Sequence, residues 1–196
     1  MLIAFNKPFG VICQFSPAGD KPTLKNHIDL PGVYAAGRLD TDSEGLLLLT
    51  DDGILQARIA DPAQKLEKTY WVQVEGEPTD AELEPMRKPL HLGDFVASPA
   101  KVRGIQAPES LWPRDPPVRF RASIPTSWLE IAITEGKNRQ IRRMTAKTGF
   151  PTLRLVRVAI GPWQLDELKP GQWRETNPAL LPRGMLRRTK MEKKTQ

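Results

Sequence analysis

Apolar and polar residues alternate in short runs along most of this chain. Residues 128–134, "WLEIAIT", alternate cleanly, and residues 68–76, "KTYWVQVEG", are rich in β-branched and aromatic side chains and end at a glycine. Both patterns are typical of β-strands. The same reasoning predicts further strands at residues 2–5, 11–15, 33–37, 46–50 and 152–161. The four leucines at 46–49 also fit a buried helix, but the glycines on either side of them favour the shorter element.

Helical signals are fewer than strand signals. Helices are predicted at residues 23–28, 54–60, from about 79, and 138–149. Thr23 is suited to cap the first of these, and Thr79 and Glu82 have the spacing of a capping box at the start of the third. The fourth is predicted to be capped by Asn138 and closed by Gly149. Strands and helices interleave without regular βαβ spacing, so we predict an α+β fold with a mixed, largely antiparallel sheet.

Two segments interrupt the pattern. Residues 104–127 contain five prolines, which remove backbone donors and break both helix and strand periodicity, so a long loop or insertion is predicted. Loops of this length are usually functional or disordered, and Trp112 among several arginines favours function. Residues 183–196 are basic and have too little apolar content to pack, so we expect a mobile tail after a single domain over 1–182.

Charge is distributed unevenly along the chain. The net charge is +6 and the pI is about 9.6, yet residues 1–100 hold 9 Lys/Arg against 15 Asp/Glu, a net −6. Residues 101–196 hold 20 against 8, a net +12. Such an imbalance indicates a polyanionic partner, nucleic acid before a membrane surface. The alternative is a basic protein with no such partner.

Composition disfavours several classes of protein. Cys13 is the only cysteine, which excludes an internal disulfide, and we expect it to be a buried, inert thiol. No apolar run approaches the roughly 20 residues of a membrane span, and "MLIAFNKPFG" lacks the features of a secretory signal. We therefore expect a soluble, cytoplasmic protein. His27 and His91 are the only histidines, so no metal-ligand cluster is predicted.

The stretch "GRLDTDSEGLLLLTDDG", residues 37–53, concentrates five carboxylates within a basic chain. Its members Asp40, Asp42, Glu44, Gly45 and Asp51 fall at positions 1, 3, 5, 6 and 12 of a calcium-binding EF-hand loop. Such a loop must lie between two helices. The proline and glycines upstream are poor material for an entering helix, and a strand, a loop and a strand fit better, so calcium is disfavoured.

A second interpretation makes these acids a solvated surface loop, the last two of them capping the following helix. That is the expectation for Asp42, Glu44, Asp51 and Asp52. Asp40 differs because it follows Arg38 and Leu39 between two apolar runs, where its side chain can point into a cleft. In a third interpretation Asp40 is a reactive carboxylate, which in a water-poor pocket needs a cationic partner to stay ionised.

Cations for Asp40 are best supplied by the segment between Gly136 and Gly161, which carries seven Lys/Arg and no acid. On the helix predicted from residue 138, the residues expected to face the core are Ile141, Met144 and Thr145. Several arginines are then left for phosphates or for Asp40. A solvated basic face is the alternative for this segment.

Four motifs in this order carry a family resemblance: "GRLDTDSEGLLLLTDDG", "EKTYWVQVEG", "EGKNRQIRRM" and "LRLVRVAIG". They resemble the motifs of the bacterial ribosomal RNA pseudouridine synthases, the family of the small-subunit synthase A, over residues 3–175. Many relatives carry an S4-like RNA-binding domain first, whereas this chain opens on "LIAFNKPFG", so none is expected. With "VYAAGRLD", "LWPRDPP" and "SIPTSWL", this makes the chain most similar to members that modify 23S rRNA near the peptidyl transferase centre.

The resemblance implies a mixed sheet with flanking helices and an active-site cleft across its middle. Asp40 would act at the ribose and glycosidic bond of a uridine, either by attack at C1′ or by taking the 2′ proton. Tyr70 would stack on the base and assist proton transfer, and Arg142 would pair with the aspartate. Arg38 would wedge into the RNA stack as the uridine leaves it. The remaining RNA-binding and pocket residues are expected to be Lys137, Arg139, Arg143, Leu155 and Ile160.

Such an enzyme is an isomerase that breaks the N1–C1′ bond, turns the uracil and rejoins it through C5. This chemistry requires no cofactor or metal, since a carboxylate, an aromatic platform and a cation suffice in principle. The implied partner is 23S rRNA or a precursor of the large ribosomal subunit, with no membrane, and we expect a monomer. The insertion and the tail are candidates for substrate choice. The alternative is a ribosome-associated RNA-binding protein without chemistry, which would not need Asp40, Tyr70 and Arg142 together.

Overall fold

The computed structural model describes residues 1–118 and 123–181. The tail predicted over 183–196 and four residues of the insertion therefore lie outside the described residues. The α-helices are α1 (Gly53–Ala60), α2 (Asp80–Leu83) and α3 (Gln140–Lys147). The strands are β1 (Leu2–Lys7), β2 (Tyr34–Ala35), β3 (Glu44–Thr50), β4 (Lys68–Glu75), β5 (Leu90–His91), β6 (Val96–Ala97), β7 (Lys101–Ile105), β8 (Thr126–Ile133), β9 (Thr152–Ile160), β10 (Trp163–Gln164) and β11 (Trp173–Glu175).

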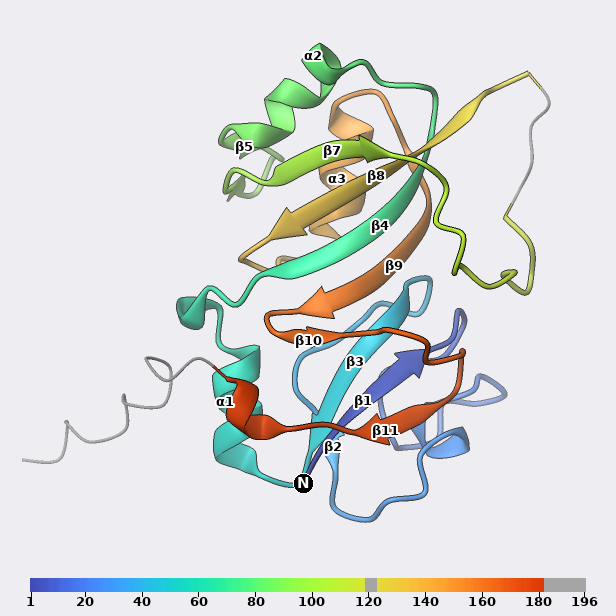
Figure 1. Cartoon of the computed structure of the whole chain (residues 1–196), viewed down its shortest axis with the longest axis vertical. Coiled ribbons are helices and arrows are strands. Elements are labelled where there is room, and N and C mark those ends of the chain that lie inside the picture. The colour runs from blue at the N-terminus through green and yellow to red at the C-terminus, as the bar shows by residue number, and fades with distance from the viewer. Residues whose placement is uncertain (119–122, 182–196) are drawn as a thin grey trace, which may run out of the picture.

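One large sheet organises the described part of the chain (Figure 1). Its strand order is β11-β1-β3-β9-β4-β8-β7, with β2 added to β3 and β10 added to β9. The ladders along this order are antiparallel except for β3 with β9. In Figure 1, α2 and α3 accompany β4, β7 and β8, whereas α1 lies beside β1 and β3. The predicted α+β fold with a largely antiparallel, mixed sheet is confirmed.

The two halves of the sheet meet where β3 and β9 run parallel. The register there pairs Glu44 with Val156 and Gly45 with Arg157. Gly45 has φ +100°, and a Cβ atom at this position would lie 2.3 Å from the carbonyl oxygen of Arg157. A glycine is therefore required on both counts. This close approach joins the acidic segment to β9.

The leucine run forms β3, and its residues pack on both faces of the sheet. Leu46 and Leu48 pack in one core cluster, on the side of α1, and Leu47 and Leu49 pack in another with Phe5 of β1. All four leucines have no exposed surface. A strand buried on both faces needs no alternation of polar and apolar residues. This explains why the hydrophobic pattern alone did not exclude a helix here.

Three predictions about local structure need correction. Residues 11–15 form only an isolated bridge, because the Ile12 amide donates to the Pro22 carbonyl and the Gln14 amide turns back to Ile12. The helix predicted at 23–28 is a short 3₁₀ turn, Leu24–Asn26, with Thr23 at its N-cap. The insertion is shorter than predicted, because β7 and β8 each extend two residues into the range 104–127.

Helix α3 begins one residue later than predicted. Its N-cap is Arg139, held in the left-handed region at φ 49°, rather than Asn138. The side chain of Gln140 accepts a hydrogen bond from the Lys137 amide at 3.1 Å instead. The other end is as predicted: Gly149 has φ +91° and the Phe150 amide returns to the Thr145 carbonyl. The three residues expected to face the core, Ile141, Met144 and Thr145, are all buried.

Candidate active site

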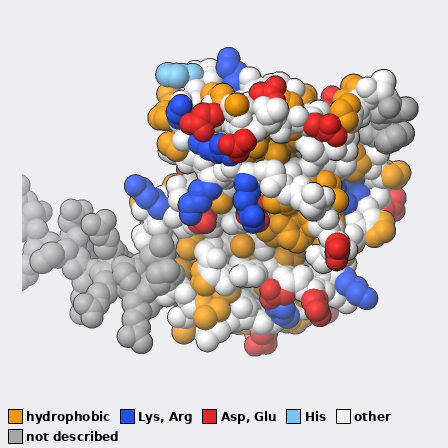
Figure 2. Space-filling view, turned by 45° about the horizontal axis from the view of Figure 1, so that its top comes forward, with side chains coloured by type: hydrophobic (Ala, Val, Ile, Leu, Met, Phe, Trp, Pro, Cys, Tyr) orange, Lys and Arg blue, Asp and Glu red, His pale blue; other side chains and the backbone are white. Residues whose placement is uncertain are grey.

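A cavity of about 590 Å³ opens beside the junction of the two half-sheets. Its walls come from the acidic segment, α1, β4, β9 and the turn that leads into α3. Seven predicted site residues line it: Arg38, Asp40, Tyr70, Lys137, Arg139, Leu155 and Ile160. Figure 2 shows Lys and Arg side chains gathered across the middle of one face of the molecule. The predicted central cleft is therefore present, with basic groups around it.

Asp40 occupies the position that its neighbours predict. Leu39 is buried, whereas Arg38 and Asp40 on either side of it are exposed, and all three line the cavity. The Asp40 side chain is 44% exposed, so in the free protein its carboxylate is hydrated. The expectation of a water-poor surrounding is therefore wrong for this state. The Nη1 atom of Arg139 lies 3.6 Å from Oδ2 of Asp40.

Asp42 has the arginine contacts that were expected for Asp40. Arg139 donates to both carboxylate oxygens of Asp42, at 3.1 and 2.9 Å. Arg142 donates from Nη2 to the Asp42 main-chain carbonyl at 2.7 Å, and its Nε lies 3.5 Å from Oδ2. Burial alone would raise the pKa of Asp42, but the hydrogen bonds from Arg139 and the charge of Arg142 lower it overall. Asp42 is thus not a solvated loop acid, and the structure pairs Arg142 with it.

Strand β4 carries the aromatic residue of the site. Tyr70 is 8% exposed and lines the cavity, with Arg157 beside it on β9. The register between β4 and β9 shifts between Thr69 and Tyr70. Leu155 and Ile160 enter the cavity from the same strand β9. The carboxylate of Asp40, the ring of Tyr70 and an apolar wall therefore border one space.

Comparison with known proteins identifies the family. The sequence profile of the RNA pseudouridylate synthases matches residues 1–147. This chain belongs to that family. Two curated relatives, both named ribosomal large subunit pseudouridine synthase E, are 58% identical to it. The protein of Vibrio vulnificus aligns over 89% of this chain and 74% of its own length, and that of Xanthomonas campestris over 89% and 94%.

A solved structure supports the same family. A crystal structure described as a pseudouridylate synthase is 30% identical, has a TM-score of 0.75, and covers 91% of this chain and 70% of its own. The predicted membership of the pseudouridine synthases is confirmed. The narrower placement with the small-subunit synthase A is not supported, because the relatives of high identity carry the large-subunit name.

Two predicted residues of this synthase stand outside the cavity lining. Arg142 is only 13% exposed and is engaged with Asp42. Arg143 pairs with Asp94 and donates to the Leu92 carbonyl, and its guanidinium stacks 4.6 Å from the centre of the Phe95 ring. Lys137 lies over the same ring, also at 4.6 Å. Part of the basic segment therefore fixes the turn between β5 and β6 to α3.

The predicted site residues include neither Lys68 nor Arg157, yet both line the cavity. Arg157 is one of the seven cations that the sequence places between Gly136 and Gly161. Lys68 precedes Tyr70 by two residues, and residues two apart on a strand share a face, so this spacing could have indicated it. Arg157 donates to the main-chain carbonyls of Leu46 and Arg38, at 2.8 and 3.3 Å. It thereby holds the chain two residues before Asp40.

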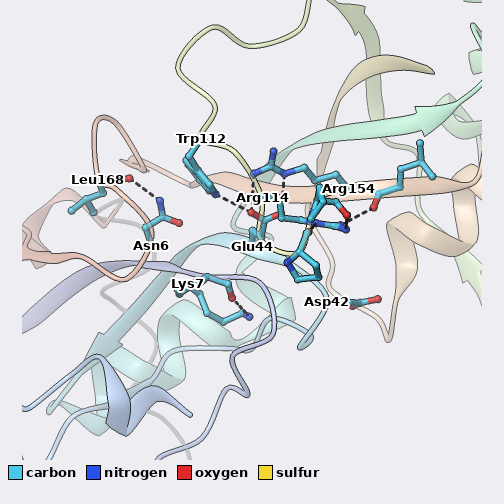
Figure 3. A network of polar contacts seen from close by, with 12 residues as sticks. Asn6, Lys7, Asp42, Glu44, Trp112, Arg114, Arg154 and Leu168 are labelled. Atoms are coloured by element: carbon cyan, nitrogen blue, oxygen red, sulfur yellow. Dashed lines mark hydrogen bonds and ion pairs between the residues drawn. The ribbon is translucent and has the colours of Figure 1, made fainter. Parts of the chain in front are cut away.

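Glu44 is an interior residue of the synthase, which corrects its prediction as a loop acid. It accepts from Nε and Nη2 of Arg154, both at 2.9 Å, and from the indole nitrogen of Trp112 at 2.9 Å (Figure 3). Its side chain is 2% exposed and that of Arg154 is 6% exposed. The insertion is therefore anchored through Trp112 to the acidic segment.

The positions of the acidic residues contradict calcium binding by this segment. Asp51 lies at the opposite end of β3 from Asp40 and pairs with the N-terminal amine of Met1 at 2.6 Å. Seven strand residues span roughly 20 Å, far beyond the size of one ion site. Among the described residues no group of three His, Cys, Asp or Glu could hold a metal ion. Of the two acids predicted to cap α1, Asp52 does so through the amides of Ile54 and Leu55, whereas Asp51 does not.

None of the helices in the described part of the chain has the length and apolar character needed to cross a membrane.

Proposed function

We propose that this synthase converts a specific uridine of 23S ribosomal RNA to pseudouridine. The observation that carries the proposal is the convergence of Asp40 and Tyr70 on one cavity in a chain of this family. The large-subunit names of the two relatives support the choice of 23S rRNA. A position near the peptidyl transferase centre is part of the proposal. A protein that only binds RNA would not require the carboxylate of Asp40 and the buried Tyr70 to line the same cavity.

Asp40 is the residue that acts at the ribose and the glycosidic bond. Its half-exposed carboxylate is open to an entering nucleotide in the free protein. A bound uridine would displace water from this carboxylate, and the Arg139 guanidinium 3.6 Å away would remain beside it as a charged partner. Arg142 contributes through Asp42, whose main-chain carbonyl it holds. Together the two arginines fix the loop that carries Asp40.

The uridine must leave the RNA stack to reach Asp40, which costs a few kcal/mol. Tyr70 offers a ring on which the extruded base can stack, and Leu155 and Ile160 line the space around it. Arg38 is exposed at the edge of the cavity, where it can take the place of the uridine in the stack. Lys137 and Arg139 are cationic groups of the cavity wall for nearby phosphates. Contact of Arg143 with RNA stays a prediction, since Asp94 already holds this side chain.

The insertion is proposed to contribute to substrate choice. Arg114 stacks on the Phe9 ring at 4.4 Å and donates to the Pro116 carbonyl at 2.8 Å. Phe9 lines a second hollow of about 320 Å³, which Asp40 and Arg139 also border. The insertion therefore reaches the edge of the site. The tail at 183–196 remains a second candidate from its charge alone.

Substrate choice is tested with ribosomal RNA transcribed with uridine tritiated at C5, because forming the C5–C1′ bond releases that tritium. The proposal predicts a plateau of one equivalent from 23S rRNA and none from 16S rRNA. Sequencing that maps pseudouridine in the product would then locate the uridine. Release from 16S rRNA alone would overturn the proposed substrate, and no release from either RNA would favour the binding-protein alternative.

We further propose that the protein acts in the cytoplasm and is a monomer. Gel filtration with light scattering would test the oligomeric state.

A further inference from the structure

Lys68 shares the cavity with Asp40 and Tyr70, but nothing assigned to the reaction so far uses it. It is the first residue of β4 and faces the same side of the strand as Tyr70. Residues two apart on a strand are separated by about 7 Å, a span that a lysine side chain can cross. The ammonium of Lys68 can therefore reach the edge of a ring that is stacked on Tyr70.

Lys68 has no hydrogen bond or ion pair among the described residues. The one acid in the lining of the cavity is Asp40, which pairs with Arg139. The neighbours of Lys68 across the sheet are Ile133 on β8 and Ile160 on β9, and both line the cavity. Burial and the nearby charge of Arg157 lower the pKa of the Lys68 ammonium. A partly buried cation without an anion costs stability unless a ligand satisfies it.

The reaction generates a negative charge on the uracil, within reach of the Lys68 ammonium. When the N1–C1′ bond breaks, both of its electrons stay with the uracil, and the charge spreads over N1 and the carbonyl oxygens O2 and O4. Forming the C5–C1′ bond uses the electron pair again, the C5 proton leaves, and N1 takes up a proton, so the step is balanced. A fixed cation in a poorly hydrated pocket is effective at stabilising such a charge.

Building on the proposed function, we propose that Lys68 contacts a carbonyl oxygen of the flipped uracil and stabilises the negatively charged base while it is detached from the ribose. The position of Lys68 favours the base over a phosphate as its ligand. It lies beside Tyr70 between two isoleucines, whereas the exposed arginines, Arg38 and Arg139, lie where a charged backbone can remain hydrated.

The test compares Lys68→Met with wild type in single turnovers at saturating enzyme, on RNA that carries uridine or 5-fluorouridine at the target. Nuclease digestion and chromatography follow the loss of either nucleoside. Fluorine withdraws electrons from the ring and stabilises the detached anion, so this substrate needs less help from a cation. We expect Lys68→Met to react roughly 100-fold more slowly or worse on uridine. The loss on 5-fluorouridine should be at least tenfold smaller, and the RNA dissociation constant should change less than threefold.

Two further variants and a stability measurement separate catalysis from structure. Lys101→Met, at an exposed lysine that pairs with Glu67 outside the cavity, should react like wild type. Lys68→Arg keeps the charge and should recover part of the rate. Thermal unfolding of Lys68→Met should be unchanged or shifted upward, because an unpaired charge is removed, whereas a structural lysine would give a lower midpoint.

Each contrary result has its own meaning. An unchanged rate for Lys68→Met, or equal losses on the two nucleosides, would overturn the role of Lys68. Weaker RNA binding with an unchanged saturating rate would assign it to a phosphate instead, which also overturns the proposal. If wild type itself converted no uridine, the proposed function would fail, and the role of Lys68 with it.

Discussion

Glu44 and Arg154 form a buried, two-point ion pair across 110 residues of sequence, with both hydrogen bonds at 2.9 Å. The pair sits at the parallel junction of β3 and β9 and also receives the indole N–H of Trp112. It therefore links three segments that border the active site: the acidic segment, β9 and the insertion.

Removing one member of this pair should destabilise the fold strongly. Glu44→Leu or Arg154→Met leaves a buried charge without its partner, which costs about 3 to 5 kcal/mol in the free energy of unfolding. Urea unfolding measures this loss. The double variant Glu44→Leu with Arg154→Met removes both charges and should be more stable than either single variant. Additive losses in the double variant would show that the two residues act independently.

Because of Lys7, the stability of the protein should change with pH in the alkaline range. Its side chain is fully buried and donates to the carbonyls of Pro8 and Val11, and burial lowers its pKa from 10.5 to about 8. Between these two values the unfolded chain holds the proton and the folded chain does not, so the contribution of Lys7 to stability rises with pH. The gain from pH 7 to 10.5 is about 3 kcal/mol.

The reference for this measurement is Lys7→Met, which lacks the titrating group. The difference in unfolding free energy, wild type minus variant, should become more positive from about pH 8 upward. Taking the difference cancels the titration of other groups. A difference that stays constant over this range would contradict the assignment.

Asp42 holds the arginines around the site without lining the main cavity. Asp42→Ala should leave Arg139 and Arg142 without their carboxylate and loosen the loop that carries Asp40. Small misplacements of reacting groups can cost roughly 100-fold in rate, so we expect a loss between tenfold and 100-fold with little change in RNA binding. The matched variant Asp29→Ala, at an exposed loop residue, should keep its rate. Wild-type turnover by Asp42→Ala would remove the positioning role.

The sequence predicted the sheet well because strand signals are local. Alternation over 128–134 became β8, and the glycines around the leucine run correctly favoured a strand. The strand predicted at residues 11–15 failed for a physical reason. Residues 11–15 are apolar enough for a strand but lack a neighbouring strand to receive their amides. A local pattern cannot show whether such a partner exists.

The sequence predicted which residues lie close together at the cavity better than it predicted how their charges pair. Seven residues that the motif resemblance indicated line one cavity. The charge partners of the basic residues depend on how segments far apart in the sequence pack together. Arg154 pairs with Glu44 because of the β3–β9 register, and Arg143 pairs with Asp94 because the turn after β5 packs against α3. Seven cations in one segment offered no local signal to distinguish these partners.

The central claim is that Asp40 performs the chemistry, and tritium release in single turnovers tests it most directly. Asp40→Asn keeps the size of the side chain and removes its charge, whereas Asp51→Asn makes the same change at the far end of β3. With 23S rRNA tritiated at uridine C5, Asp51→Asn should match wild type. Asp40→Asn should still bind the RNA and release tritium at least roughly 1,000-fold more slowly. Release by Asp40→Asn at the wild-type rate would contradict the account.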